Sequence, residues 1–187
     1  MERRELLKMI ALATGGVVIG GEFLLSGCSN PAAKTGMAFS SSEISFLDEV
    51  AETILPRTNT PGAKDAEVGK FMTVMVADCY KAADQKVFRE GFAKLNKACN
   101  KMHSHDFMKA TAEHRTELLK TLDKEAKDYN KNKEKDTPNH YFTMMKQLTM
   151  LGYFTSKPAL TEAFNYQQTP GKYDGAYPYK KGDKLFV

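Results

Sequence analysis

Apolar residues recur at helical spacing in five successive stretches between about residue 41 and residue 152. The first stretch opens with Ser40 and Glu43 in the order of a capping box, and it ends at Pro56. No stretch alternates with a period of two, so strands are not expected. The pattern therefore predicts an all-α fold, a small helical bundle of about five to six helices. The apolar positions of the first helix are Ile44, Leu47, Val50, Ala51, Ile54 and Leu55.

The next four stretches predict the rest of the bundle. Residues 81–85 join the second and third helices, which predicts an antiparallel hairpin. Thr111 can cap the fourth helix, and Pro138 suits the first turn of the fifth. The charged residues 124–136 predict a solvated helix end that leads into a mobile loop. The apolar faces comprise Val68, Phe71, Met72, Met75, Val76 and Cys79; Val87, Phe88, Gly91, Phe92, Leu95, Ala98, Cys99 and Met102; Leu118, Leu119, Leu122, Ala126 and Tyr129; and Tyr141, Phe142, Met145, Leu148, Thr149 and Gly152.

The C-terminal stretch is aromatic and rich in turn residues. Ser156 as a cap and Pro158 in the first turn predict a short helix that runs through Phe164. An extended aromatic tail with Pro170, Gly171, Asp174, Gly175 and Pro178 follows it. Composition favours packing of this tail on its own domain, and a contact with a partner is the alternative.

The N-terminal segment has the features of an export signal. Arg3 and Arg4 form a twin-arginine pattern, and a glycine-rich apolar run follows them. The run ends at Leu25-Ser26-Gly27-Cys28, which resembles a lipobox with Cys28 as the lipidated residue. An uncleaved membrane anchor is less favoured, because the run is only about 17 residues long and spanning usually needs ~20. We expect a signal peptide at residues 1–28, a flexible tether at 29–39 and a folded domain at 40–187.

Composition and motifs argue against catalysis and against a cofactor in this chain. The 187 residues suffice for one domain, and the net charge of +4 is too small for a nucleic-acid-binding surface. No glycine-rich turn follows a predicted strand, as a flavin or nicotinamide site would require. No Cys-x-x-Cys-His sequence suggests haem, and three cysteines are too few for an iron–sulfur cluster.

One cluster has residue types that ligate metals. His103, His105 and Asp106 follow Cys99, but a satisfied surface pair is the favoured interpretation, and no metal site is expected. His114 and His140 look isolated on polar stretches. Helical geometry places Cys79 and Cys99 too far apart along the predicted hairpin for a disulfide.

Three segments resemble one family. Residues 152–156 (Gly-Tyr-Phe-Thr-Ser), residues 170–175 (Pro-Gly-Lys-Tyr-Asp-Gly) and the Leu-Pro and Thr-x-Thr-Pro-Gly-Ala elements of residues 55–63 are similar to the gluconate 2-dehydrogenase subunit 3 family. These proteins are small, flavin-free subunits of membrane-associated sugar and sugar-acid dehydrogenases. The resemblance implies a large partner flavoprotein of the glucose-methanol-choline (GMC) oxidoreductase type, which carries FAD, and often a cytochrome c that accepts the electrons.

By this likeness the chain is an accessory subunit that helps the flavoprotein fold, leave the cytoplasm by the twin-arginine route and stay at the membrane as a periplasmic lipoprotein. The loop of residues 54–66 is expected to be structured, and whether it is only a connector or also a partner contact stays open. Two alternatives are a free-standing lipoprotein that binds a small ligand or polysaccharide through its tail, and an enzyme of unrecognised mechanism. The expected partner-binding residues are Tyr153, Phe154, Tyr166, Tyr173, Asp174, Gly175 and Tyr177.

Overall fold

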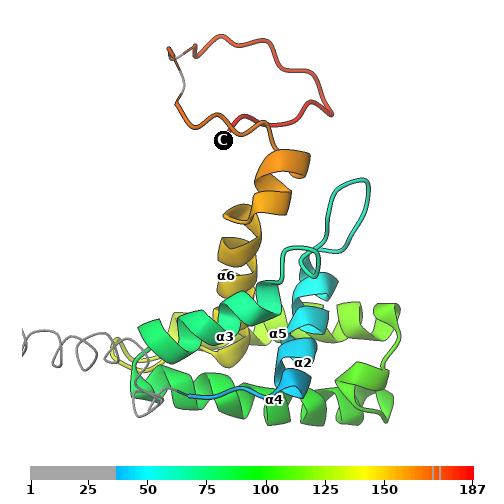
Figure 1. Ribbon diagram of the computed structural model, residues 1–187. Coiled ribbons are helices and arrows are strands. Elements are labelled where there is room, and N and C mark those ends of the chain that lie inside the picture. Colours follow the sequence, from blue (N-terminus) through cyan, green and yellow to red (C-terminus); the bar gives the residue numbers. More distant parts are fainter. Residues whose placement is uncertain (1–36, 170, 173) are drawn as a thin grey trace, which may run out of the picture. The chain divides into compact units, whose positions relative to one another are not determined.

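The structure, a computed structural model, describes residues 37–169, 171–172 and 174–187. Within them the all-α prediction is confirmed, and the only strand-like pairing in this part is an isolated bridge between Asn165 and Phe186. The described α-helices are α2 (Ser41–Ile54), α3 (Val68–Cys79), α4 (Ala82–His103), α5 (Ala112–Asn132) and α6 (Tyr141–Phe154) (Figure 1). Two shorter segments join them, the 3-10 helix η3 (Phe107–Lys109) and the π-helix η4 (Ala159–Ala163).

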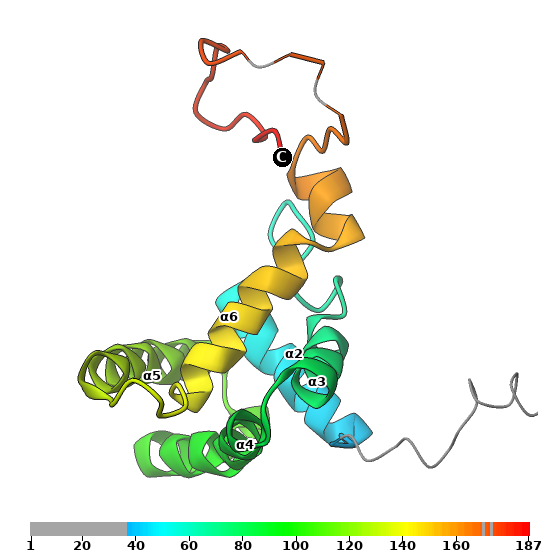
Figure 2. The ribbon, with the colours of Figure 1, turned by 90° about the vertical axis from the view of Figure 1, so that its left-hand side faces the viewer.

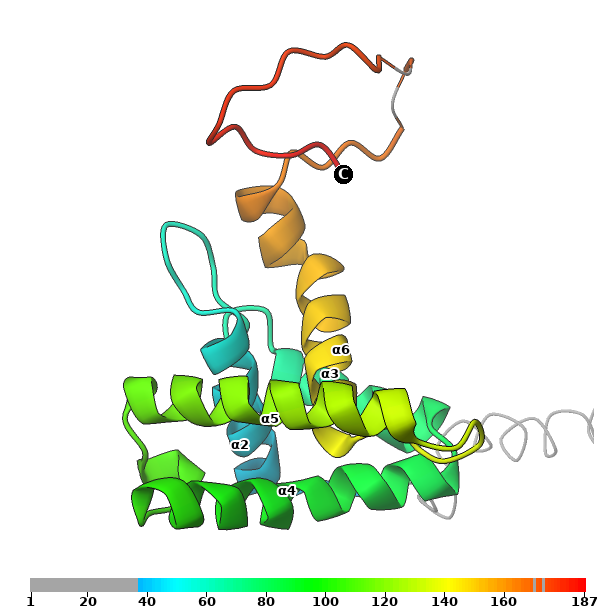
Figure 3. The same cartoon turned by 180° about the vertical axis from the view of Figure 1, so that it is seen from behind.

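Helix α6 is the centre of the helical domain. It packs against α2, α3, α4 and α5, and it buries eight of its own residues. Helices α4 and α5 lie side by side in opposite directions and are joined through η3, whereas α2 and α6 cross them (Figures 2 and 3). The start of α6 lies against α4, where Gly91 meets Tyr141, and its end lies against α3, where Gly152 meets Phe71.

Side-chain caps fix where several helices begin. Ser40 and Glu43 form the predicted capping box, with the Ser40 backbone N–H donating to Glu43 Oε2 at 2.8 Å. Thr111 Oγ1 accepts from the backbone N–H of His114 at 3.3 Å, as predicted for α5. The turn from α3 to α4 contains only Tyr80 and Lys81, shorter than the five residues expected. The two caps fix the starts of α2 and α5, and the short turn fixes the start of α4 relative to the end of α3.

The start of α6 differs from the prediction. Pro138 was expected in its first turn, but the helix begins at Tyr141. His140 is the N-cap, since its Nδ1 accepts from the backbone N–H of Phe142 at 3.3 Å. Pro138 instead belongs to the preceding turn, where its carbonyl accepts a 3.4 Å hydrogen bond from Tyr129. An imidazole cap carries no strong sequence signal, and this explains the shift of the boundary.

The compact unit that contains the helices is Met37–Val187. Met37 and Phe39, which were assigned to the tether, pack against the core. The Phe39 ring lies 6.3 Å from that of Phe88, and the Arg89 guanidinium lies 4.8 Å above Phe39. The export arginines Arg3 and Arg4, the lipidation residue Cys28 and most of the expected tether lie outside the described residues.

None of the helices in the described residues combines the length and the apolar character needed to cross a membrane.

Candidate functional site

A buried tyrosine joins the end of α6 to the loop of residues 55–66. The Tyr153 hydroxyl donates a 2.7 Å hydrogen bond to the carbonyl of Pro61. From the sequence we expected Tyr153 to contact a partner. Only 6% of Tyr153 is exposed, however, so its ring is not available on the surface of this chain. Tyr153 instead positions the loop next to the end of α6, and both lie on the same side of the helices in Figure 1.

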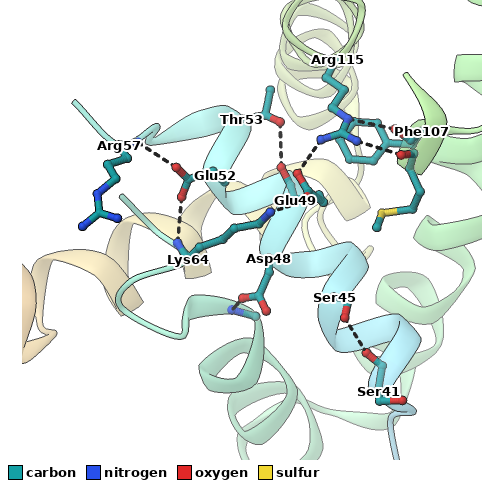
Figure 4. A network of polar contacts seen from close by, with 12 residues as sticks. Ser41, Ser45, Asp48, Glu49, Glu52, Thr53, Arg57, Lys64, Phe107 and Arg115 are labelled. Carbon is teal, nitrogen blue, oxygen red and sulfur yellow. Dashed lines mark hydrogen bonds and ion pairs between the residues drawn. The ribbon is translucent and has the colours of Figure 1, made fainter. Parts of the chain in front are cut away.

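The loop of residues 55–66 is fixed by a carboxylate of α2. Glu52 Oε1 accepts from the backbone N–H of Arg57 at 2.8 Å, and its Oε2 accepts from that of Lys64 at 2.9 Å (Figure 4). Gly62 permits this approach, because a Cβ there would lie 2.5 Å from both Glu52 oxygens and 2.6 Å from the Arg57 nitrogen. The loop is therefore structured, as predicted.

A second set of polar contacts ties the loop to the rest of the bundle. Glu49 forms ion pairs with Lys64 of the loop and with Arg115 of α5 (Figure 4). Just after the loop, Asp48 Oδ1 accepts from the backbone N–H of Gly69 at 2.8 Å. Burial raises the pKa of the Asp48 carboxyl above its usual value, and the hydrogen bond from Gly69 opposes that effect. Carboxylates of α2 thus contact the beginning of the loop at Arg57, its second half at Lys64 and the start of α3 at Gly69.

The tip of the loop and the end of α6 present different chemistry to the solvent. Residues 56–59 are exposed, and the backbone N–H of Thr58 donates to the carbonyl of Thr60 at 3.1 Å. Phe154 is 39% exposed, and its ring centroid lies 5.6 Å from that of Phe164. Of the two expected partner-binding residues at the end of α6, Phe154 is the one on the surface.

The short helix that follows α6 begins as predicted. Ser156 Oγ accepts from the backbone N–H of Ala159 at 3.3 Å, and the segment ends at Ala163, one residue before the expected end. This helix carries the chain from the end of α6 to the tail.

The tail, residues 165–187, closes on itself. The backbone N–H groups of Asn165 and Gln167 donate at 2.9 Å to the carbonyls of Leu185 and Val187, respectively. The Val187 N–H returns a 3.3 Å hydrogen bond to the Asn165 carbonyl, so the two ends of the tail are paired (Figures 1 and 3). The tail is thus a closed loop attached through η4.

Apolar side chains of the tail are exposed. More than half of the surface of each of six residues is open to solvent: Tyr166, Tyr177, Tyr179, Leu185, Phe186 and Val187. Tyr177 and Phe186 stack edge to face with centroids 5.1 Å apart. Composition favoured packing of the tail on its own domain, but these side chains contribute nothing to the buried core. They leave an apolar surface of the tail open to solvent.

A turn at Asp174 shapes one side of this loop. Asp174 Oδ1 accepts from the backbone N–H of Ala176 at 3.1 Å, and the Asp174 carbonyl accepts from that of Tyr177 at 3.4 Å. Asp174 and Gly175 therefore lie in the turn expected from the sequence, and Tyr173 lies outside the described residues. A hollow of about 540 Å³ is lined by residues of the tail that include Tyr177 and Tyr179.

Three of the four histidines come together at the connection from α4 to α5, which corrects the expectation that His114 is isolated. The rings of His103 and His114 stack with centroids 4.1 Å apart, and His105 Nε2 lies 3.4 Å from His114 Nδ1. In the described residues no group of three or more His, Cys, Asp or Glu side chains has an arrangement that could hold a metal ion. The connection from α4 to α5 places His114 beside His103 and His105, which precede it by nine or more residues in the chain.

The two cysteines of the described chain are free thiols. Cys79 is exposed and Cys99 is buried. Burial raises the pKa of the Cys99 thiol, which favours the protonated, unreactive form.

The fold and this surface define a small all-α domain that presents an ordered loop and a closed aromatic tail. The chain belongs to the gluconate 2-dehydrogenase subunit 3 family, whose sequence model matches residues 41–171. The match includes the loop, Tyr153, Phe154 and Tyr166, and it ends within the tail, before Asp174. Comparisons with curated proteins and with solved structures find no match. The family is one of subunits of a dehydrogenase complex.

Proposed function

We propose that this chain is the non-catalytic small subunit of a periplasmic sugar or sugar-acid dehydrogenase complex. Its main partner is a GMC-type flavoprotein that carries FAD and the catalytic residues, and a cytochrome c is the further partner that the family resemblance implies. Membership of the gluconate 2-dehydrogenase subunit 3 family supports this assignment, because the family is named for a subunit of such a complex. The chain itself contributes binding surface and holds no cofactor.

The exposed apolar surface of the tail carries the proposal. Six side chains that are each more than half exposed gather on one closed loop of 23 residues, residues 165–187. Tyrosine and phenylalanine supply large contact area with few rotatable bonds, and they are enriched at protein interfaces. Backbone pairing of Asn165 with Leu185 and Val187 limits the entropy that the tail loses on binding. A partner protein that covers this loop would bury the apolar side chains.

The loop of residues 55–66 and Phe154 are proposed as the second part of the same interface. The loop is held by Glu52 and Tyr153, so its exposed tip is preorganised for contact. Phe154, whose ring lies beside that of Phe164 just before the tail, adds an exposed apolar side chain at the end of α6.

We also propose that the N-terminal segment exports the complex and anchors it. Arg3 and Arg4 would direct the chain to the twin-arginine route, which carries folded proteins. A flavoprotein bound to this chain could then cross the membrane with its FAD in place. Cys28 would carry the lipid that holds the complex at the membrane.

Co-purification tests the proposal. The full chain, tagged and expressed with the proteins of its own cell, should bring down a much larger flavoprotein in equal amount, and the complex should show flavin absorbance. The same chain purified without the partner should be colourless. A chain that is always recovered alone, or that shows stoichiometric flavin by itself, would refute the assignment.

Labelling with a fatty acid tests the anchor separately. The wild-type chain should incorporate the label and Cys28→Ser should not, whereas Cys79→Ser should be labelled like the wild type. Equal labelling of the wild type and Cys28→Ser would remove the lipoprotein assignment and leave the partner assignment untouched.

One observation favours a second candidate function. The hollow of about 540 Å³ in the tail is bounded by Tyr177 and Tyr179, and aromatic rings of this kind also stack on sugar rings. A free-standing lipoprotein could bind a small ligand or polysaccharide there. Binding of oligosaccharides by the partner-free chain, lost in Tyr177→Ala, would support this alternative.

A further inference from the structure

The three clustered histidines come from separate parts of the chain. His103 is the last residue of α4, His105 lies in the connection and His114 is in the first turn of α5. The ring centroids of His105 and His114 are 5.4 Å apart, and those of His103 and His105 are 6.1 Å apart. Three of the four histidine rings of the chain therefore lie within one small volume.

One distance in this cluster has the value expected for two ligands of a single metal ion. His105 Nε2 and His114 Nδ1 form a long hydrogen bond of 3.4 Å, in which either ring can be the donor. Zinc binds imidazole nitrogens at about 2.0–2.1 Å in tetrahedral geometry, which places two such nitrogens about 3.3–3.4 Å apart. These two nitrogens therefore already have the separation of a tetrahedral edge.

The third histidine has a nitrogen without a partner. His103 Nε2 is buried and forms no hydrogen bond. Buried polar atoms are nearly always satisfied, and a bound metal ion is one partner that would satisfy this nitrogen. The His103 ring stacks on that of His114 with an angle of 8° between their planes, so their nitrogens do not converge as the structure stands. Because His103 is the last residue of its helix, its side chain can rotate to another rotamer.

We propose that His103, His105 and His114 form a binding site for a zinc-like divalent transition-metal ion. His105 and His114 supply the two nitrogens that are already at ligand spacing. Rotation of His103 brings in its unpaired Nε2 as the third, and water completes the four ligands. The ion would cross-link the end of α4 to the start of α5 and stabilise that corner of the bundle. The site is separate from the partner-binding tail, so this inference does not depend on the proposed function.

Titration of the metal-free full chain with Zn²⁺ alone tests the site. We expect one Zn²⁺ per chain and a rise of the melting temperature on binding. His103→Gln, His105→Gln and His114→Gln should each weaken binding by at least about tenfold, because each removes a ligand. X-ray absorption of the bound zinc should show three imidazole ligands.

Control variants separate this site from others. His140→Asn removes the fourth histidine but keeps an N-cap residue at α6, so Zn²⁺ binding should be unchanged. Cys79→Ser should also bind like the wild type. Circular dichroism of each metal-free variant checks that the helices remain. Absence of stoichiometric Zn²⁺ binding, or equal binding by the wild type and the variant with all three histidines replaced, would overturn the proposal.

Discussion

The Tyr153 hydroxyl donates its hydrogen bond to the Pro61 carbonyl across 92 residues of sequence. This contact connects the last turn of the central helix to the loop between α2 and α3. It is buried, so neither group has water as a replacement partner. The loop and the end of α6 are therefore coupled through this contact, and we expect a change at Tyr153 to alter the loop.

We predict that Tyr153→Phe lowers the free energy of unfolding by about 1–2 kcal/mol, because the Pro61 carbonyl stays buried without its donor. Urea unfolding measures this loss. Affinity for the flavoprotein should also fall, since the loop loses an anchor. Tyr129→Phe is the matched control, because the Tyr129 hydroxyl forms a longer, exposed 3.4 Å hydrogen bond. Equal destabilisation by both variants would show that the buried Tyr153 hydrogen bond stabilises the fold no more than the exposed Tyr129 hydrogen bond does.

A second prediction concerns Gly62. Its added Cβ in Gly62→Ala would lie 2.5 Å from the Glu52 carboxylate and 2.6 Å from the Arg57 nitrogen, which is backbone and cannot easily move. We expect a loss of about 1–3 kcal/mol in unfolding free energy and faster amide hydrogen exchange at Arg57. Gly171→Ala meets no atom within 4 Å and should leave both quantities unchanged. An unaltered exchange rate at Arg57 in Gly62→Ala would contradict the tight loop.

The helices were predictable because each combines a periodic apolar face with a local cap. The faces of α2 and α6 and the caps Ser40 and Thr111 depend on residues within one or two turns. Tyr153 could also have been recognised as buried, since it continues the apolar face of α6 four residues after Thr149. Its assignment to a partner surface came from its place in the aromatic C-terminal stretch, in a segment that resembles the family.

The contacts that could not be predicted from the sequence depend on loop segments, which have no repeating pattern of apolar and polar residues. The pairing of Asn165 with Leu185 depends on how the tail turns, and no alternation of residues marks it. The approach of His114 to His105 depends on the path through η3. Such contacts are set by loop geometry, which composition and spacing do not encode.

A third prediction concerns acid stability. Hydrogen bonds from Lys127 and then Lys146, at 2.7 and 2.6 Å, lower the pKa of the Asp123 carboxyl. The folded chain therefore binds fewer protons at this site than the unfolded chain. This stabilisation is present at neutral pH and is lost as the pH falls through the folded pKa. Asp123→Asn should show a smaller decline of unfolding free energy between about pH 7 and pH 3 in urea titrations.

The fourth prediction concerns Asp48, whose carboxyl has the opposite effect on the stability of the folded chain in acid. Burial raises the pKa of its carboxyl, so protonation favours the folded chain and contributes stability as the pH falls. Asp48→Asn should therefore make the acid-side decline steeper than in the wild type. If the unfolding free energies of Asp123→Asn and Asp48→Asn both fall with pH as steeply as that of the wild type, these two carboxyls do not determine acid stability.

The last prediction concerns the tail. Removal of residues 165–187 should abolish association with the flavoprotein and leave the helices folded. The six exposed apolar side chains of this segment contribute nothing to the buried core, and its backbone hydrogen bonds near Asn165 are made within the tail. The helical circular-dichroism signal should therefore persist, while the flavoprotein no longer co-purifies. If export depends on this chain, periplasmic dehydrogenase activity should fall as well.

Point variants give the finer test. Tyr177→Ser with Phe186→Ser removes the edge-to-face pair from the tail without shortening the chain, and we expect at least a tenfold loss of partner affinity, about 1.4 kcal/mol. Met102→Ser removes an exposed apolar side chain from α4 and should not affect binding. A truncated chain that unfolds would show that the tail is part of the core. A truncated chain that still binds its partner would place the interface on the loop of residues 55–66 or on the helices.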